Sequence, residues 1–144
     1  MYRTIVVGTD GSRTAQAAVR HAVELARVTG ATLHLVAARQ IAYAAAGSAE
    51  VGATGLDPVT AAAESSAAAL EMGVAEAEAA KVPVETHDPT GAAAAALIDI
   101  AKSTSADLIV VGSRGMHGAR RVLGSTPNSV THQAPCHVLV VHTD

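Results

Sequence analysis

The chain has 144 residues, of which 49% are hydrophobic and 16% charged, and its formal net charge is −3. This length predicts a single domain over residues 1–144 with a sizeable core, and the composition excludes a disordered chain. Nucleic-acid binding is not expected, because the charge is negative and aromatic residues make up only 1%. No apolar run approaches the roughly 18 residues of a membrane span and the N-terminus lacks a signal-peptide pattern, so we expect no membrane association and a cytoplasmic location.

The N-terminal third of the chain predicts a strand, a helix and a second strand. The apolar run Thr4 to Val7 predicts the first strand, which ends at Gly8. Ser12 is a suitable N-cap for the helix that follows, and Gly30 lies where a C′ glycine would end it. Thr32 to Ala38 predicts the second strand. We expect Leu33 and Leu35 on one face of this strand, and His34 and Val36 on the other.

The middle of the chain combines a long loop with less regular elements. Arg39 to Pro58 is rich in Ala, Gly and Ser and is predicted as a loop that could fold over a ligand. A helix is predicted over Pro58 to Lys81. Its apolar side is expected to consist of Val59, Ala63, Ala67, Leu70, Val74 and Ala77. Val82 to Thr86 predicts an edge strand, because Pro83 cannot donate to a central ladder. A third helix is predicted from Asp88-Pro89-Thr90 to Ala101, with Leu97, Ile98 and Ala101 as its inner residues.

The C-terminal third holds the pattern that points to a ligand. Leu108 to Val111 predicts a buried parallel strand that ends at Gly112. A basic loop follows, with Gly115, Gly118 and Gly124. Thr126 is the expected N-cap and Pro127 the first residue of a helix that reaches about Gln133. His137 to Val141 predicts the fifth strand.

A strand, a glycine-rich loop and a helix N-terminus together predict an anion site. Glycines allow the backbone to approach a ligand closely, and free N–H groups at a helix start point at negative charge. The loop has no GxxxxGK[ST] sequence, so it is not a P-loop. It follows the fourth strand and not the first, so it is not a Rossmann fingerprint either. We therefore predict a phosphate site of another kind.

Five strands alternate with four helices, which predicts an α/β fold with a parallel sheet and helices on both faces. Ligands of such folds bind at the carboxyl ends of the strands. Gly8 to Asp10 and Gly112 to Gly115 both lie at strand ends. They would meet if the first and fourth strands were neighbours, as in a sheet of order 3-2-1-4-5.

Three segments resemble the universal stress protein family. Val7 to Ser12, VGTDGS, resembles its opening signature, and Gly112 to Gly115 followed by Gly124-Ser125 resembles its nucleotide motif. Ala134 to Val141 is similar to the family's last strand. The resemblance implies a flavodoxin-like, Rossmann-like three-layer sandwich of order 3-2-1-4-5 and homodimers through the last strand, residues 137–141. It also implies binding of ATP, or of AMP or cyclic AMP.

The resemblance also implies roles for single residues. Asp10 would contact the ribose or adenine, and Ala38 would line the adenine pocket. Val111 and Gly112 would face the base. Gly115, Gly124 and Ser125 would surround the phosphates. The complete set of expected binding residues is Gly8, Asp10, Ala38, Val111, Gly112, Arg114, Gly115, Gly124, Ser125 and Thr126.

The glycine motif departs from the family pattern by one residue, because Met116 to Leu123 is eight residues long where the family has nine. Eight residues can reach roughly 30 Å when extended, and losing one removes only about 3.5 Å, so we expect binding to survive. Which phosphates are recognised by Arg114, Arg120 and Arg121 stays open, because these arginines could equally be solvated surface residues.

Simpler interpretations compete with each site prediction. Asp10 could merely hold the turn before the first helix, and Ser125 could be a turn residue. Cys136, the only cysteine, is expected to act as a small hydrophobic residue at the start of a buried strand. The seven histidines show no paired ligand spacing, so no metal site is expected. No catalytic residue is predicted.

The sequence therefore predicts an adenine-nucleotide-binding stress sensor or regulator and not an enzyme. A slow ATPase is an alternative, and it would need Mg²⁺ held by a carboxylate near the phosphates. Asp10 is the obvious candidate for that carboxylate, because no acidic residue lies between Val110 and Asp144. We expect weak hydrolysis at best. A dimer that has lost its ligand is the remaining alternative.

Overall fold

The computed structural model describes residues 1–41, 57–113 and 125–143. The strands are β1 (Thr4–Gly8), β2 (Thr32–Val36), β3 (Val84–His87), β4 (Leu108–Gly112) and β5 (His137–Val141). The helices are α1 (Arg13–Thr29), α2 (Pro58–Ala79), α3 (Ala93–Ser103) and α4 (Ser125–Gln133). All strand pairs are parallel and the sheet order is β3-β2-β1-β4-β5, so the predicted fold and strand order are confirmed.

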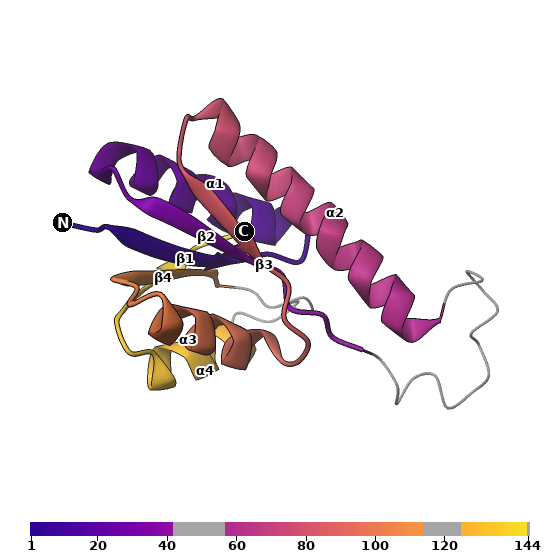
Figure 1. Ribbon diagram of the computed structural model, residues 1–144. Coiled ribbons are helices and arrows are strands. Elements are labelled where there is room, and N and C mark those ends of the chain that lie inside the picture. Colours follow the sequence, from indigo (N-terminus) through magenta and orange to yellow (C-terminus); the bar gives the residue numbers. More distant parts are fainter. Residues whose placement is uncertain (42–56, 114–124, 144) are drawn as a thin grey trace.

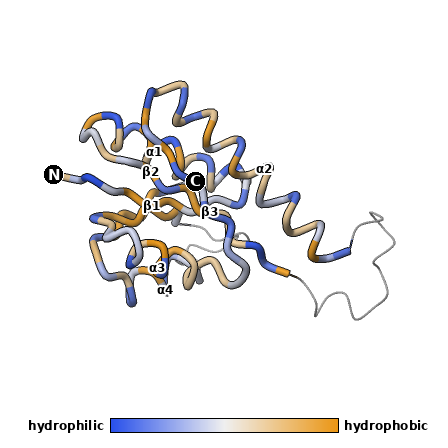
Figure 2. Tube along the Cα trace, in the orientation of Figure 1, coloured by the Kyte–Doolittle hydropathy of each residue, from blue (hydrophilic) through white to orange (hydrophobic). Residues whose placement is uncertain are grey.

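The sheet lies between two helical layers. Helices α1 and α2 cover one face, and α3 and α4 cover the other (Figure 1). Successive residues of β1 alternate between these layers, since Ile5 and Val7 pack with α1 while Val6 packs with α3. All three side chains are fully buried, so the central strand is hydrophobic on both faces (Figure 2). This two-sided burial explains why the strands read as continuous apolar runs.

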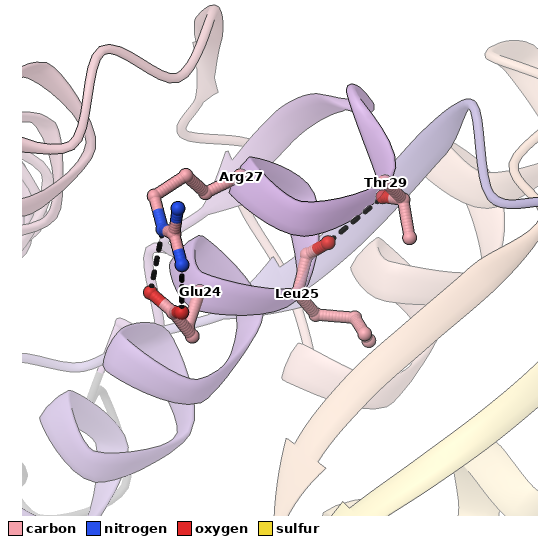
Figure 3. A network of polar contacts seen from close by, with 4 residues as sticks. All are labelled: Glu24, Leu25, Arg27 and Thr29. Atoms are coloured by element: carbon pink, nitrogen blue, oxygen red, sulfur yellow. Dashed lines mark hydrogen bonds and ion pairs between the residues drawn. The ribbon is translucent and has the colours of Figure 1, made fainter.

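Helix α1 begins and ends where its sequence predicts. The Ser12 hydroxyl accepts a hydrogen bond from the Ala15 N–H at 3.2 Å, and Gly30 adopts the left-handed conformation with φ of 75°. Such a conformation strains any residue with a side chain. In the last turn the Thr29 hydroxyl donates to the Leu25 carbonyl at 2.8 Å, and Arg27 forms an exposed ion pair with Glu24 (Figure 3). The predicted Ser12 and Gly30 caps are confirmed.

The inner face predicted for α2 is partly wrong. The buried residues are Ser66, Ala69, Gly73 and Ala77, of which only Ala77 was predicted. Val59 is 48% exposed, and Leu70 and Val74 only flank the core. Small residues are buried because the helix lies close to β2: a Cβ atom on Gly73 would lie 2.7 Å from the Leu35 Cδ1 atom. The helix is uniformly rich in alanine, so its hydrophobic pattern does not mark a face.

The starts of the two later helices also differ from the prediction. Helix α3 begins at Ala93 and not at Asp88, because the preceding residues pair with the exit of β2. The Arg39 N–H donates to the Pro89 carbonyl at 2.7 Å, and Arg39 forms an ion pair with Asp88 at 2.5 Å. Helix α4 begins at Ser125, so Thr126 lies inside its first turn and its prediction as the N-cap is wrong.

The boundaries of β2 and β3 differ from the predicted ones. Strand β2 ends at Val36 and not at Ala38, and β3 covers Val84–His87 and not Val82 to Thr86. The edge position of β3 is confirmed. The expectation of a buried last strand is wrong, because β5 is the opposite edge of the sheet and its residues are exposed or half-buried. In the described residues, no helix is both long and apolar enough to span a membrane.

Candidate functional site

A cavity of about 250 Å³ opens at the carboxyl ends of β1, β2 and β4. These are the strands at which the chain reverses its direction across the sheet, since β2 lies on one side of β1 and β4 on the other. Parallel α/β sheets bind ligands at such a switch point. The volume is near the lower end of the range for small-molecule sites, about 300 Å³. Both helical layers contribute to the walls, through α1, α2, α3 and α4.

The turn between β1 and α1 forms one wall of the cavity and is held by its own side chains. The Asp10 Oδ1 atom accepts from the Ser12 N–H at 2.8 Å, and the Thr9 hydroxyl accepts from the Gly11 N–H at 3.2 Å. Gly11 has φ of 81°, which favours glycine. Asp10 thus does hold the turn, as the simpler interpretation predicts. Its Oδ2 atom makes no hydrogen bond within the described residues, and Asp10 lines the cavity.

The exit of β2 lies beside this turn and also lines the cavity, since the Thr9 N–H donates to the Val36 carbonyl at 2.9 Å. The Ala37 N–H donates to the His87 carbonyl at 2.9 Å, and the Arg39 N–H donates to the Pro89 carbonyl at 2.7 Å. Successive backbone groups of an extended chain point in opposite directions, so those of Ala38 point away from β3 and toward the cavity that this residue lines. The Ala38 N–H has no hydrogen bond to another described residue. This wall therefore offers a backbone donor and acceptor to a ligand.

Strand β4 and helix α4 complete the site. Val111 is buried and Gly112 follows it at the cavity. A Cβ atom on Gly112 would lie 3.1 Å from the Thr143 Cγ2 atom, so the glycine allows the C-terminal segment to pack here. Thr126 and Pro127, in the first turn of α4, also line the cavity. The N-terminus of a helix carries a partial positive charge, so this side of the cavity is suited to an anionic group.

Six of the predicted site residues come together at this cavity. They are Gly8, Asp10, Ala38, Val111, Gly112 and Thr126. Ser125 is the exposed first residue of α4 and is not among the residues that line the cavity. Arg114, Gly115 and Gly124 lie outside the described residues, as do Arg120 and Arg121. The strand ends are thus placed by the structure, while most of the glycine motif is not.

Other lining residues were missed by the sequence analysis. Those from α2 are Ala62, Ser65, Ser66 and Ala69, and those from α3 are Ala93 and Leu97. No local pattern could have indicated them, because the two helices reach the cavity only through the tertiary fold. Thr9, Ser12 and Thr14 also line the cavity. The GTDGS sequence could have identified Thr9 and Ser12, but its hydroxyl groups were interpreted only as turn and capping groups.

The cavity combines apolar surface with hydroxyl groups. Val36, Leu97 and Val111 supply the apolar part, while Thr9 and Ser65 supply hydroxyl groups. Such a lining suits a flat heterocycle with polar substituents. Within the described residues, the lining includes no histidine, cysteine or lysine that could act as a nucleophile or base.

Cys136 is not part of the site and is unsuited to covalent chemistry. It is half-buried and packs against the cluster formed by α3, α4 and the sheet. Burial raises the pKa of the Cys136 thiol above its ordinary value, with a smaller contribution from Asp107. The thiol is therefore protonated at neutral pH and a poor nucleophile, in agreement with its predicted role as a small hydrophobic residue.

Comparison with known proteins places this chain in a family. The sequence profile of the universal stress protein family matches residues 1–142. A universal stress protein of Mycobacterium tuberculosis is 34% identical over 143 residues, which cover 99% of this chain and 97% of the relative. A universal stress protein solved in complex with cAMP is 32% identical, with a TM-score of 0.72 over 99% of this chain and 98% of that chain.

A second solved structure supports the same assignment. The universal stress protein UspA from Lactobacillus plantarum is 26% identical, with a TM-score of 0.79 and coverage of 97% of both chains. Sequence similarity over the whole chain and a shared sheet topology therefore agree. The chain belongs to the universal stress protein family.

Proposed function

We propose that the cavity binds an adenine nucleotide and that the protein acts as a nucleotide-dependent stress sensor or regulator in the cytoplasm. The observation that carries this proposal is the position of the cavity at the switch point, with the Ala38 backbone on one side and the start of α4 on the other. A relative that is 32% identical has been solved in complex with cAMP, which supports an adenine nucleotide as the ligand class.

The chemistry of the walls suggests how such a ligand would lie. The base would pack on the apolar surface of Val111 and Leu97 and form hydrogen bonds to the Ala38 backbone. The Oδ2 atom of Asp10 would accept from a ribose hydroxyl. The anionic end would then point toward Thr126 and the glycine motif, where the partial charge of the helix terminus stabilises each interaction by about 0.3–1 kcal/mol.

The possible ligands differ in the phosphate groups that they carry. ATP is the proposed ligand, with AMP and cyclic AMP as the alternatives. If ATP binds with Mg²⁺, Asp10 is the acidic residue of the described cavity wall that could hold the ion, and its Oδ2 atom would then contact the ion in place of the ribose hydroxyl. Rapid hydrolysis would also require a positioned water and further charge at the phosphates. We therefore expect slow turnover at most.

Calorimetric titration of the full chain with ATP, AMP and cyclic AMP tests the proposal. Ser65 is an exposed α2 residue that lines the cavity, so Ser65→Trp should fill the site and lower the affinity at least tenfold with little effect on folding. Ala68→Trp is the matched control, because Ala68 is exposed on the same helix and does not line the cavity. Absence of binding for all three ligands at millimolar concentration would overturn the proposal.

The edge strand β5 supports a second part of the proposal, homodimerisation. Four consecutive apolar residues, from Val138 to Val141, are only half-buried on an edge strand. Exposed apolar edges favour pairing with another chain. We therefore propose that two copies associate through residues 137–141, with or without nucleotide. A dimer that bound no nucleotide would assign the function to its partner surface instead.

A further inference from the structure

Two histidines form a contact at the β2–β3 edge, beside the cavity and not within it. The His34 Nδ1 and His87 Nε2 atoms lie 2.9 Å apart, which is a hydrogen-bond distance. The rings are stacked with centroids 5.2 Å apart and an interplanar angle of 22°. His34 is only 6% exposed, so its imidazole is largely removed from solvent. A hydrogen bond between two imidazoles requires one nitrogen without a proton.

The neighbouring carboxylate assigns the protons. The His34 Nε2 atom lies 3.4 Å from the Glu85 Oε2 atom, so the proton of neutral His34 belongs on Nε2. The His34 Nδ1 atom is then the acceptor, and the His87 Nε2–H is the donor. A proton added to the His87 Nδ1 atom leaves this bond intact. A second proton, on the His34 Nδ1 atom, leaves neither of the two facing nitrogens with a lone pair and breaks the bond.

The backbone links this histidine pair to the cavity. The His87 carbonyl accepts from the Ala37 N–H at 2.9 Å, and the Pro89 carbonyl accepts from the Arg39 N–H at 2.7 Å. These two bonds flank Ala38, whose backbone faces the cavity. The wall proposed to bind the base is therefore held by the segment that begins at His87. A movement of the His87 backbone would also release the Ala37 N–H from the His87 carbonyl.

We propose that His34 and His87 are positioning residues that make the nucleotide affinity of the cavity depend on pH, because protonation of both imidazoles separates the rings and loosens the wall at Ala37 and Ala38. This inference rests on the proposed nucleotide function for its ligand. The coupling between the histidine pair and the wall can be measured without a ligand.

The surroundings of His34 determine the pH at which this occurs. Burial lowers the pKa of His34 below the ordinary value of 6.5, Glu85 opposes this shift, and His87 adds to it. On the same face of the sheet, α3 carries Asp99 and Lys102, both exposed, and neither contributes to the pKa shift of His34. The charges of α1 and α2 lie across the sheet. The change should therefore occur below pH 6.5, where histidine in an unfolded chain already binds a proton.

The Asp88–Arg39 ion pair acts in the same segment. Its atoms lie 2.5 Å apart, and both residues are partly exposed. A partly exposed ion pair contributes little to stability. The ion pair ties the same segment to Arg39 and involves neither histidine.

Amide hydrogen exchange measured by NMR on the full chain tests the coupling. In His34→Asn, the amide oxygen can take the place of the Nδ1 acceptor but cannot titrate. At pH 5, the Ala37 and Arg39 amides should exchange at least fivefold faster in the wild type than in His34→Asn, and at pH 7.5 the rates should agree. Comparison at one pH removes the intrinsic pH dependence of exchange. Equal rates at pH 5 would overturn the inference.

His87→Gln is a second variant that tests whether both rings must be protonated. The glutamine amide can turn its oxygen toward a protonated His34 Nδ1–H, so the contact survives when His34 is protonated. This variant should therefore show the slower exchange of Ala37 and Arg39 at pH 5 that is expected of His34→Asn. Exchange as fast as in the wild type would contradict the role given to the histidine pair. His21→Asn, on the exposed side of α1, is the control and should behave like the wild type.

Titration with cyclic AMP extends the test to ligand binding. Its phosphodiester keeps one charge between pH 5 and pH 7.5, whereas the monoester of AMP titrates near pH 6. Affinity should fall by up to about tenfold per pH unit below the pKa of His34 in the wild type, and less than twofold overall in His34→Asn. Binding that is lost equally in both proteins at pH 5 would contradict the inference. Absence of binding already at pH 7.5 would contradict cyclic AMP as the ligand, while the exchange rates would still decide the coupling.

Discussion

The two edges of the sheet differ in chemistry. At β3, Pro83 precedes the strand, and Glu85 and Thr86 are exposed. The histidine pair lies on the face of the sheet that α3 covers. At β5, only His137 is exposed, and the four apolar residues that follow are half-buried. Charge and proline discourage a second chain from pairing with an edge, whereas an apolar strand favours it. One edge is therefore suited to shaping the cavity wall, and the other to association.

The largest expected effect is a loss of stability, compared between one leucine near each edge of the sheet. Leu35 is a fully buried residue of β2, and Leu35→Ala should lower the free energy of unfolding by about 2–5 kcal/mol. Leu139→Ala, in half-buried β5, should lower it by roughly half as much. Urea unfolding at low protein concentration measures both. Equal losses would show that β5 is buried in solution, and a loss for Leu139→Ala that grows with protein concentration would indicate the dimer.

Association itself can be tested by placing one charge on each edge. Val140→Lys should weaken the homodimer about 100-fold or more, because a lysine ammonium would be removed from water at the apolar interface. Thr86→Lys is the matched control on β3 and should leave association unchanged, since Thr86 is exposed there. Sedimentation velocity over a concentration series gives both constants. A dimer that is disrupted only by Thr86→Lys would place the interface at the opposite edge.

The close packing of α2 on the β2 side predicts a smaller loss. Gly73→Ala should destabilise the protein by about 1–3 kcal/mol, because the new Cβ atom would lie 2.7 Å from Leu35 Cδ1. The flexible end of Leu35 can move partly aside, so a folded protein is expected. Thermal unfolding measures the effect. Recovery of stability in the double variant Gly73→Ala with Leu35→Val would confirm that this contact is the cause.

The histidine pair predicts the smallest effect, a pH dependence of stability. The pKa of His34 is lowered in the folded protein, so below pH 6.5 the unfolded chain binds more protons and stability falls as the pH decreases. The loss approaches at most about 1.4 kcal/mol per pH unit. Urea unfolding between pH 7 and pH 5 should show this fall in the wild type but a weaker one in His34→Asn.

The carboxylates act in a separate pH range. Backbone hydrogen bonds from Arg3 and Thr4 lower the pKa of Asp107, so its contribution is present above the unfolded value near 4 and is lost only as the pH falls further. Stability that is unchanged from pH 7 to pH 5 and decreases only near pH 4 would therefore assign the acid sensitivity to carboxylates and contradict the role of His34.

The sequence is sufficient to predict the strands and α1, because their signals are local. Strands β1 and β4 are apolar on both faces, and Ser12 and Gly30 act on the helix that they flank. The start of α3 was not predictable in this way. Asp88-Pro89 resembles a helix start, but both residues instead contact Arg39, which is distant in sequence. A local pattern cannot show that a better partner lies elsewhere in the fold.

The candidate site was predictable only along the strand ends. Gly8, Asp10 and Gly112 follow apolar runs, and parallel strands bring such positions to one edge of the sheet. Ser65 and Ser66 lie in an alanine-rich helix whose inner face has no distinct pattern, so their approach to the cavity depends on packing. The contact between His34 and His87 also depends on strand register, which places them on the same face of adjacent strands.

The parallel topology has a consequence for folding during synthesis. The central strand β1 is synthesised first, yet its neighbour β4 follows about a hundred residues later, as the Arg3–Asp107 hydrogen bond spans 104 positions. Pairings this distant form slowly. A chain emerging from the ribosome lacks two walls of the cavity until β4 and α4 have been translated. Closure of the cavity therefore has to await the translation of β4 and α4.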